Sequence, residues 1–423
     1  MGEGSAGRVL VVGMGVSGTA TAARLRAAGW TPVIVERAAQ RRSGGYFIVL
    51  FGAGHEAAKR LGILEHMHDR AGSKDNLDID RRGGASASAS FSDLLGDPWL
   101  MLRGDVEQAA HAALPDDVEV RFSTVPTAIE QDADGVDVTL LDTASGAETT
   151  ERFDLVVGAD GVRSTVRSLV FGPHEDYLQR LGYMIAAFEC QNTPPGLVEG
   201  QSATMLEPGR SMWIFAFSDH NPTTLLTYKT DDVDAEFSRP PAERLRAAFG
   251  PEPLGESLTS AIAEFEASDQ AVFDSVEQVR MDSWHRGRVV LVGDSAWCVT
   301  LYTGMGASSG LMGADLLGTA LEQHDDVETA LAEWERSLRP YIDFYLDKAA
   351  EQRKLFVADS RLEIRIRKLA SMLAKIPFCK PLVARMLQID SILENKGADI
   401  IDKMLTTLSG ANRRQRDSVA ESA

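Results

Sequence analysis

The chain has few cysteines for its length, only three in 423 residues. Cys190, Cys298 and Cys379 lie far apart, so they form neither a CxxC pair nor the spacing of a disulfide framework. Because disulfides are rare where thiols are kept reduced, we expect a cytoplasmic protein. The same scarcity predicts that no metal is bound.

Positive charge and long apolar runs are also lacking. The 43 Lys and Arg residues are outnumbered by 62 Asp and Glu residues, which leaves a net charge of −19 at pH 7. Nucleic-acid binding needs Lys and Arg in excess to neutralise phosphates, so no nucleic-acid partner is expected. No run of about 18 apolar residues is present, so no transmembrane segment is expected. The start of the chain also lacks the pattern of a signal peptide.

The first pattern that carries chemistry begins at the eighth residue. Arg8–Val12 (RVLVV) reads as a buried strand, and GMGVSG follows at residues 13–18. Residues 19–28 read as a helix rich in alanine, and residues 33–35 as a second strand that ends at Glu36. The order of strand, GxGxxG, helix, strand and acid is typical of a dinucleotide-binding unit.

Each residue type in this pattern has a physical task. Gly13 permits the tight turn, Gly15 lets a pyrophosphate approach the backbone, and Gly18 lets the helix pack close to the strand. The helix N-terminus offers free N–H groups and a partial positive charge to the phosphates. Glu36 lies 23 residues after Gly13, near the expected spacing for an acid that binds a ribose.

Two later segments repeat the passage from an apolar strand to a turn and a helix. GADGVRSTVR follows an apolar strand at residues 158–167, and GDSAWCVTLYTGMGASSG follows another at residues 293–310. A nicotinamide dehydrogenase needs neither segment. The dinucleotide is therefore expected to be FAD rather than NAD.

In this order and spacing, the three segments resemble the fingerprints of the para-hydroxybenzoate hydroxylase family. These are single-component FAD-dependent aromatic hydroxylases, and they include the tetracycline-inactivating monooxygenases. RSGGYFI at residues 42–48 is similar to the family loop beside the flavin ring, and LRGDVEQAAHAAL at residues 102–114 to the segment whose Arg contacts the flavin. The resemblance covers roughly residues 8–346.

The resemblance implies a role for several residues. Glu36 would bind the adenosine ribose, Arg103 the flavin, and Asp294 the ribityl chain. Asp160 would support the pyrophosphate and the approach of NAD(P)H. The helix that starts after Gly304 would point its N-terminus at the pyrimidine end of the flavin. The full set of expected FAD contacts is Gly13, Gly15, Val16, Ser17, Gly18, Glu36, Arg37, Arg42, Arg103, Asp160, Gly161, Gly293, Asp294, Gly304, Gly306 and Ala307.

The expected fold is α/β: a Rossmann-like FAD-binding domain with an inserted β-sheet substrate domain and a C-terminal helical segment. The inserted domain is predicted from short apolar runs separated by Pro and Gly turns. Those runs are residues 183–189, 203–206, 212–217, 224–228 and 271–279. The boundaries are residues 1–175 and 280–346 for the FAD-binding domain, 176–279 for the substrate domain, 347–408 for the C-terminal helices and 409–423 for a flexible tail.

A substrate pocket is expected where aromatic residues gather near the flavin. Residues 212–217 are apolar on both strand faces, so one face can line a pocket, although plain core packing explains them equally well. The candidates are Tyr46, Phe47, Met212, Trp213, Phe215, Phe217, Tyr228, Trp297 and Leu301. Trp297 and Leu301 depart from the family pattern, which has His and Pro there. We expect Trp297 to lie near the flavin or pocket and Leu301 to loosen or reshape the oxygen-transfer site.

The resemblance implies a monooxygenase that uses NAD(P)H and O2. Reduced FAD would form a C4a-hydroperoxide and pass one oxygen atom to an aromatic or polyketide-like small molecule. The residues do not separate hydroxylation, epoxidation and Baeyer–Villiger oxidation, and they offer no general base, so the catalytic residues stay unassigned. A flavin dehydrogenase or reductase and a non-catalytic accessory protein remain as alternatives. A monomer or homodimer is expected.

Overall fold

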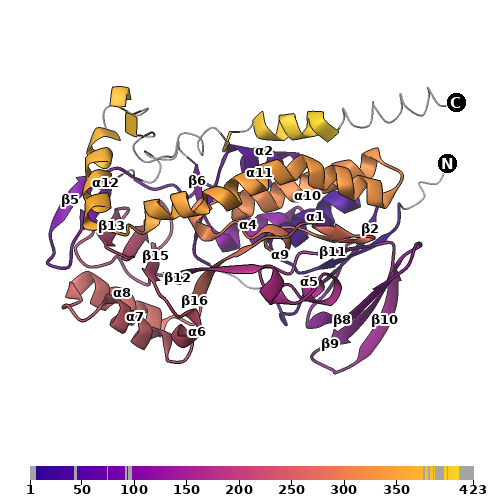
Figure 1. Ribbon diagram of the computed structural model, residues 1–423, viewed down its shortest axis with the longest axis horizontal. Helices are drawn as coiled ribbons and strands as arrows, with labels where there is room; N and C mark the ends of the chain where they lie inside the picture. Colours follow the sequence, from indigo (N-terminus) through magenta and orange to yellow (C-terminus); the bar gives the residue numbers. More distant parts are fainter. Residues whose placement is uncertain are drawn as a thin grey trace.

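The computed structural model describes residues 6–41, 45–73, 75–90, 93, 98–374, 377–379, 382–383, 385, 395–397 and 399–408. Arg42 and the predicted tail at 409–423 lie outside the described residues. Within the described part, helices and four sheets form a mixed α/β structure (Figure 1). This confirms the predicted fold class. No helix in that part is long and apolar enough to cross a membrane.

The first sheet is built from short strands of valine, isoleucine and leucine that are buried on both faces. In β1 the residues from Val9 to Val12 are at most 4% exposed, as expected for a parallel strand covered by helices. All pairs are parallel except the edge strand β17. The spatial order is β17 (His285–Arg286), β18 (Val289–Leu291), β11 (Leu155–Gly158), β1 (Arg8–Val12), β2 (Thr31–Val35) and β7 (Glu119–Arg121).

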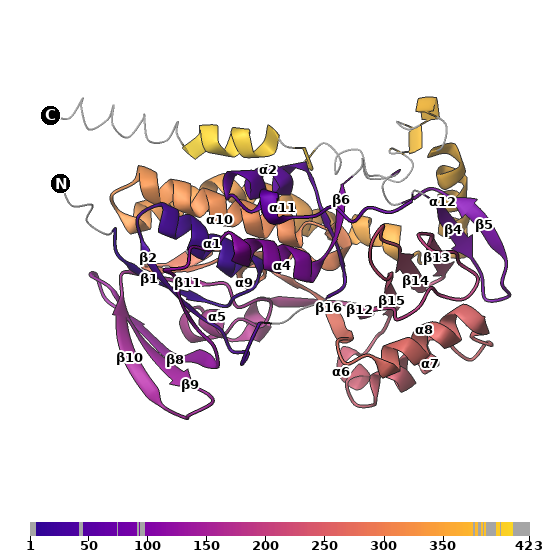
Figure 2. The ribbon, with the colours of Figure 1, turned by 180° about the vertical axis from the view of Figure 1, so that it is seen from behind.

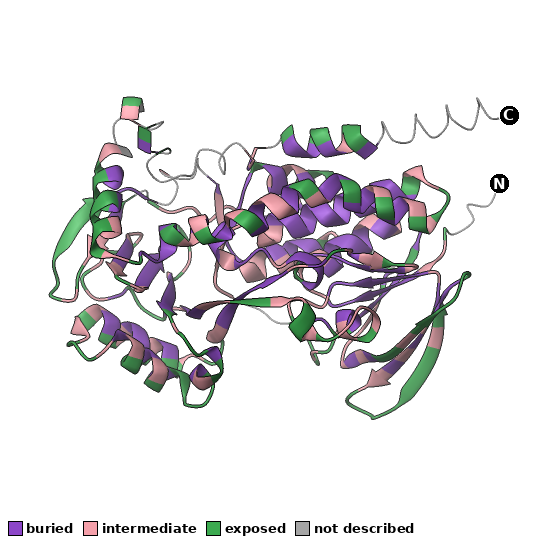
Figure 3. Ribbon diagram, viewed as in Figure 1, coloured by how far each residue is buried: buried purple, intermediate pink, exposed green. Residues whose placement is uncertain are grey.

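Small residues bring the helices over this sheet close together. Helix α10 (Gly306–Gln323) packs on α1 (Val16–Ala27), on α2 (Gly52–Arg60) and on the long helix α11 (Val327–Phe356) (Figures 1 and 2). A Cβ on Gly310 would lie 2.3 Å from the Ser17 Oγ, so only glycine allows this approach. The buried residues concentrate in this helical layer and in the sheet (Figure 3).

The second large sheet is mostly antiparallel, and its outer face is covered by α7 (Pro241–Phe249) and α8 (Gly255–Ala267). Five of its strands confirm the apolar runs expected between residues 183 and 279, but two come from a much earlier segment. Its spatial order is β16 (Val272–Val279), β12 (Leu178–Glu189), β15 (Thr223–Lys229), β14 (Arg210–Phe215), β13 (Ser202–Glu207), β4 (Asn76–Ile79) and β5 (Ala85–Ser88).

Two smaller sheets and several short helices complete the described structure. The remaining strands are β8 (Thr124–Gln131), β9 (Val136–Asp142) and β10 (Glu148–Phe153) in one sheet, and β3 (Phe47–Leu50) and β6 (Trp99–Leu102) in the other. The remaining helices are α4 (Arg103–Ala112), α5 (Thr165–Val170), α6 (Val233–Glu236), α9 (Asp294–Trp297) and α12 (Arg361–Ala374). Residues 399–408 are also helical.

The topology leaves a space between the two large sheets. The carboxyl ends of β1, β11 and β18 meet at one edge of the parallel sheet, which is where open α/β sheets bind their ligands. The inner face of the second sheet is turned toward this edge, because residues of β12, β14, β15 and β16 line the same cavity as the turns after β1 and β11.

Candidate active site

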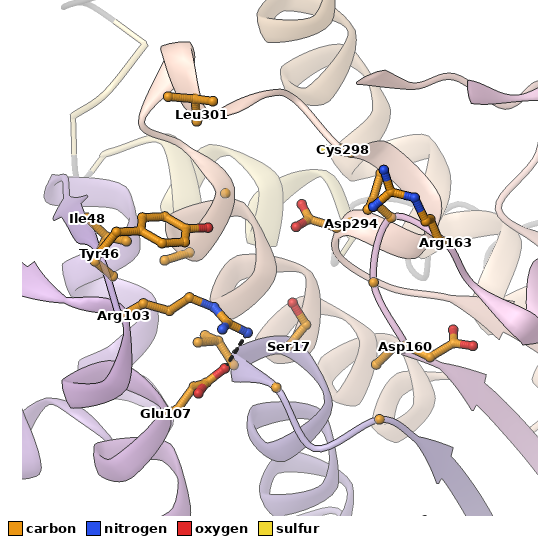
Figure 4. A pocket seen from close by; sticks show the side chains of 18 of the residues that line it. Ser17, Tyr46, Ile48, Arg103, Glu107, Asp160, Arg163, Asp294, Cys298 and Leu301 are labelled. Carbon is orange, nitrogen blue, oxygen red and sulfur yellow. Dashed lines mark ion pairs between the residues drawn. The ribbon is translucent and has the colours of Figure 1, made fainter. Parts of the chain in front are cut away.

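One cavity of ≈ 520 Å³ runs from the turn after β1 to the inner face of the second sheet. Its charged side chains come from loops and helices beside the first sheet and from β16, and its apolar side chains come largely from β3, β12, β14 and β15. Figure 4 shows Tyr46 and Arg103 on one side of this space and Asp294, Arg163 and Cys298 on another.

The glycines of the first turn have three different surroundings. Gly13 has φ +101, and a Cβ there would lie 2.5 Å from the Ala159 carbonyl oxygen. A Cβ on Gly18 would lie only 2.0 Å from the Gly13 carbonyl oxygen, so this glycine sets how closely α1 packs on the turn. Gly15 is open, since the nearest atom to its Cβ position is the Glu107 Oε1 at 3.9 Å. Gly15 thus leaves room for a ligand, whereas Gly13 and Gly18 hold the turn.

The acid at the end of β2 also holds the turn. The Glu36 Oε2 accepts a hydrogen bond from the Met14 N–H at 2.9 Å, and the Oε1 accepts one from the Ala38 N–H at 2.8 Å. The carboxylate is partly exposed and lines the cavity. Each oxygen keeps a lone pair, so Glu36 can accept ribose hydroxyls while it fixes the loop.

Asp160 lines the cavity, but its carboxylate is committed to α5. The Oδ2 accepts hydrogen bonds from the N–H groups of Thr165 at 2.6 Å and Val166 at 3.1 Å, and the Oδ1 accepts one from the Ser164 hydroxyl. Burial raises the pKa of Asp160, and these hydrogen bonds oppose the rise. We infer that Asp160 fixes the shape of the turn between β11 and α5.

Asp294 contrasts with Asp160, because its carboxylate has no hydrogen-bond partner among the described residues. Its side chain is exposed to the interior of the cavity, where desolvation raises its pKa and the charge of Arg103 lowers it. Arg103 forms an ion pair with Glu107 at 2.6 Å, one turn along α4 (Figure 4). An unpartnered carboxylate that faces a cavity is ready to accept hydroxyl groups from a ligand.

The third turn is strained. Thr300 has φ +70 and ψ 156, a region that non-glycine residues rarely occupy and that costs about 1–3 kcal/mol. Gly304 follows in the left-handed region at φ +64. Helix α10 then begins at Gly306 without a side-chain cap, and Gly304, Gly306 and Ala307 line the cavity. The free N–H groups of this helix start are therefore available to an electron-rich ligand.

These features fit FAD. The open Gly15 and the uncapped start of α1 suit a pyrophosphate, Glu36 and Asp294 supply acceptors for sugar and ribityl hydroxyls, and the start of α10 supplies donors. Gly15, Glu36, Asp294 and the start of α10 all line one cavity.

The profile of the family described as "FAD binding domain" matches residues 7–326. The chain belongs to this family of FAD-dependent monooxygenases. A "Flavin-dependent monooxygenase" from an unknown prokaryotic organism is 28% identical over 372 residues, which are 84% of this chain and 90% of that protein. The solved structure of tetracycline destructase Tet(51) is 26% identical with a TM-score of 0.73, and the match covers 89% of this chain and 98% of that one. Klebsiella pneumoniae HpxO, solved with FAD and uric acid, has the same fold at 20% identity, with a TM-score of 0.66 and 94% of this chain and 97% of that one covered.

The FAD-dependent monooxygenase thus has most of its expected cofactor residues around one cavity. Gly18 and Gly293 do not line it, because they sit behind the turns, and Gly293 packs on Ser17. Arg42 lies outside the described residues. The residues brought together are Gly13, Gly15, Val16, Ser17, Glu36, Arg37, Arg103, Asp160, Gly161, Asp294, Gly304, Gly306 and Ala307.

The substrate-pocket candidates divide between this cavity and other places. Met212 and Tyr228 were predicted to line the substrate pocket, but they point to the outer face of the sheet, among residues packed against α7 and α8. The reason is that side chains alternate along a strand. Trp213 and Phe217 do not line the cavity either. The Trp213 indole donates hydrogen bonds to the Ser211 hydroxyl and the Phe356 carbonyl, both at 3.2 Å. Tyr46, Phe47, Phe215 and Leu301 do line it.

Trp297 is the largest correction. Its side chain is fully buried away from the cavity, with ring centroids 4.5 Å from Trp284 and 5.8 Å from Trp334. Gly313 of α10 makes room for it, because a Cβ there would lie 2.9 Å from the indole. The departure from the family His therefore changes the core behind the site.

Replacing Trp297 by a residue with a smaller ring tests whether its side chain belongs to the core. We expect Trp297→Phe to lower the free energy of unfolding by about 1–3 kcal/mol, because it removes ring volume and the hydrogen bond to the Ser309 hydroxyl at 3.2 Å. FAD affinity stays as in the wild type. Chemical denaturation and FAD titration measure the two effects, and weakened FAD binding with unchanged stability would place Trp297 at the cofactor after all.

The sequence did not point to several residues that line the cavity. Ile185, Thr223 and Leu225 belong to strands whose inner face depends on register, and Phe356 lies at the end of α11, far from any fingerprint. Strand alternation offered a signal for the first three but did not say which face was inward. Cys298 also lines the cavity, and burial raises its pKa well above the usual value, so its thiol stays protonated.

Proposed function

We propose that this monooxygenase uses NAD(P)H and O2 to insert one oxygen atom into a neutral, flat, apolar small molecule of aromatic or polyketide-like structure. The observation that carries the proposal is an aromatic chamber in the same cavity as the FAD cradle. Tetracycline destructase Tet(51), named for a polycyclic polyketide, is consistent with this class.

Apolar side chains from β3, from the second large sheet, from the third turn and from the end of α11 wall the chamber. Phe47 of β3 stacks on Phe215 of β14, with ring centroids 3.8 Å apart and an angle of 4° between the planes. Further apolar residues that line the cavity include Ile185, Ala187, Leu225, Leu301 and Phe356. Because this pair is already in contact, a planar ring system would stack on an outer aromatic face and add offset stacking to the burial of apolar surface.

The charges at the rim disfavour an anionic substrate. Asp274 and Glu277 reach the cavity from β16, and both contact Arg163, at 2.7 Å and 3.4 Å. Arg103 is engaged by Glu107. A carboxylate substrate would have to compete for these cations beside two acids, so a neutral molecule fits better.

When bound, FAD supplies the redox chemistry: it accepts a hydride from NAD(P)H and delivers the electrons to O2, so one oxygen atom enters the substrate and the other leaves as water. The chain supplies the surroundings. The N–H groups at the start of α10 favour negative charge on the ligand beside them, typically by 0.3–1 kcal/mol and up to about 2 kcal/mol when partly buried. The apolar walls of the chamber limit the access of water, which protects reactive intermediates from side reactions.

The reaction is tested with isotopic oxygen. The purified holoenzyme is mixed with NADPH or NADH, a panel of planar polyketides and phenols, and ¹⁸O2, and the products are analysed by mass spectrometry. We expect one ¹⁸O atom per product and consumption of NAD(P)H that a neutral planar compound stimulates. An oxidised product without ¹⁸O would mean a dehydrogenase, and stimulation only by carboxylates would refute the substrate class.

Thr223 offers a sharper test of the chamber. Its side chain is 1% exposed and lines the cavity, and its hydroxyl has no hydrogen-bond partner among the described residues. A buried unpaired hydroxyl costs about 1–3 kcal/mol, so it is suited to a polar group of the substrate.

We expect Thr223→Val, which keeps the shape, to raise the melting temperature of the apoprotein and to raise the KM of the substrate found with ¹⁸O2 by about tenfold. Thr224→Val is the matched control, because the hydroxyl of Thr224 already bonds to the Cys190 thiol at 3.1 Å. A lower melting temperature with an unchanged KM for Thr223→Val would mean that this hydroxyl serves the fold alone.

A further inference from the structure

Lys396 reaches the strained third turn from behind. Its Nζ donates a hydrogen bond to the Thr303 carbonyl oxygen at 3.1 Å and lies 3.7 Å from the centroid of the Phe51 ring. The backbone carbonyl groups of Lys396 and of the residue before it also accept hydrogen bonds. The Lys396 carbonyl accepts from the Ala53 N–H at 3.3 Å, and the Asn395 carbonyl accepts from the Tyr345 hydroxyl at 3.0 Å.

This lysine is buried without a counter-charge. Lys396 is only 6% exposed. No carboxylate contacts its ammonium group in the part of the chain that the structure describes. Burial lowers the pKa of Lys396 to about 7. Buried lysines without a paired acid are rare, because desolvating the charge is costly. A chain that keeps one at this place needs the charge or the hydrogen bond there.

The turn that Lys396 holds faces the cavity on its other side. Thr300, Leu301 and Gly304 line the cavity, whereas the Thr303 carbonyl points back to the lysine. Gly304 has no room for a side chain, since a Cβ would lie 2.6 Å from Val49. The turn is thus clamped between β3, Phe51 and Lys396, which explains how the φ of Thr300 is maintained.

We propose that Lys396 is a positioning residue of the flavin site, which fixes the turn of residues 300–304 and places a positive charge behind the start of α10. The inference rests on FAD occupying this cavity, but not on the proposed reductant or substrate. The charge would add to the field of the helix N-terminus, because α10 begins at Gly306, three residues after the Thr303 carbonyl that Lys396 binds.

A consequence follows for the cofactor. Two-electron reduction leaves negative charge on the flavin ring, so a nearby positive charge stabilises reduced FAD more than oxidised FAD. Removing that charge weakens the binding of reduced FAD relative to oxidised FAD, on the order of tenfold. For a two-electron couple this is a midpoint potential about 30 mV lower.

The experiment measures the FAD midpoint potential of the full-length holoenzyme by spectroscopic redox titration. Lys396→Met removes the charge and the hydrogen bond, whereas Lys396→Arg keeps a charge. Lys403→Met is the matched control, because Lys403 is an exposed lysine of the same C-terminal segment, paired with Asp399 at 2.6 Å. We expect a lower potential for Lys396→Met, a potential near wild type for Lys396→Arg, and no change for Lys403→Met.

The pH profile gives a second readout that does not depend on Lys396→Met folding. Among the described residues, the groups packed against the Lys396 ammonium are Phe51 and the Thr303 backbone, which do not titrate, and neither does Ala53, whose N–H binds the Lys396 carbonyl. Tyr345, which holds the adjacent residue, has its pKa raised by burial to well above neutral. Between about pH 6 and 8 the wild-type potential therefore falls more steeply than that of Lys396→Arg, which stays charged.

Each result of the redox titration either supports or overturns the proposal. A folded Lys396→Met protein with the wild-type potential overturns the proposal, and so do identical pH profiles for wild type and Lys396→Arg. A lower melting temperature alone, with an unchanged potential, would make Lys396 a purely structural residue. Failure to hold any FAD in the wild type would instead refute the cofactor assignment.

Discussion

Asp294→Asn is expected to make the apoprotein more stable and FAD binding weaker. The wild-type carboxylate faces the cavity without a hydrogen-bond partner among the described residues, and desolvation raises its pKa. An amide of the same shape avoids this cost. The same change removes a charged acceptor for ligand hydroxyls, which is worth about 1.5–3 kcal/mol or roughly 10- to 100-fold in affinity.

The sign of the pH dependence follows from the raised pKa. Between the unfolded and the folded pKa of Asp294, the folded state binds more protons, so the stability of the wild-type apoprotein falls as the pH rises through this window. The gain from Asp294→Asn is therefore full above the folded pKa and disappears in acid. Thermal unfolding at a series of pH values and fluorescence titration with FAD measure the two effects.

Asp160→Ala is the contrasting control, because that carboxylate accepts three hydrogen bonds at the start of α5. We expect it to lower the free energy of unfolding by about 1–2 kcal/mol. If Asp294→Asn also destabilised the apoprotein, Asp294 would be a structural acid like Asp160, and its assignment to the ribityl chain would fail.

Adding one methyl group at two glycines of the first turn is expected to separate binding from folding. Gly15→Ala meets no protein atom closer than 3.9 Å, and its φ of −75 suits alanine, so the apoprotein keeps its stability. If Gly15 faces the pyrophosphate, as we propose, the methyl group takes its place and FAD affinity is expected to fall on the order of 100-fold, about 2.7 kcal/mol.

Gly18→Ala is expected to do the opposite. Its methyl group would lie 2.0 Å from the Gly13 carbonyl oxygen, so α1 has to move away from the turn, at a cost of about 3 kcal/mol or more in stability. Denaturant unfolding of both apoproteins and FAD titration of Gly15→Ala decide the matter. An undiminished FAD affinity in Gly15→Ala would show that no phosphate passes this turn.

The fold was largely predictable because its signals are local. The apolar strands, the GxGxxG turn and the small residues after Gly304 lie within short windows, and each window dictates its own backbone. Strands β4 and β5 were not anticipated, since they join the second sheet from residues 76–88 through the pairing of β4 with β13, a contact that no local pattern encodes. Helices α7 and α8 were likewise not expected within the β-rich region.

The site residues also fall into two groups, those that the local sequence predicts and those that depend on packing. Positions such as Gly15, Glu36 and Gly306 could be predicted to line the cavity from motif spacing, because each lies at or near the end of a strand or the start of a helix that the local sequence specifies. Side-chain positions were less certain. Met212 and Trp297 are large apolar residues near the site in the sequence, yet strand alternation and helix packing turn both away from the cavity.

By itself, the sequence determined that this protein binds FAD, because the GxGxxG turn and Glu36 indicate a dinucleotide site and the two later strand-to-helix segments indicate that the dinucleotide is FAD. Only the tertiary structure decided which side chains face the substrate chamber. That choice depends on sheet register and on which element covers each face, which are properties of the packed chain. It also decided that Lys396, which comes late in the chain and outside every fingerprint, lies directly behind the third turn.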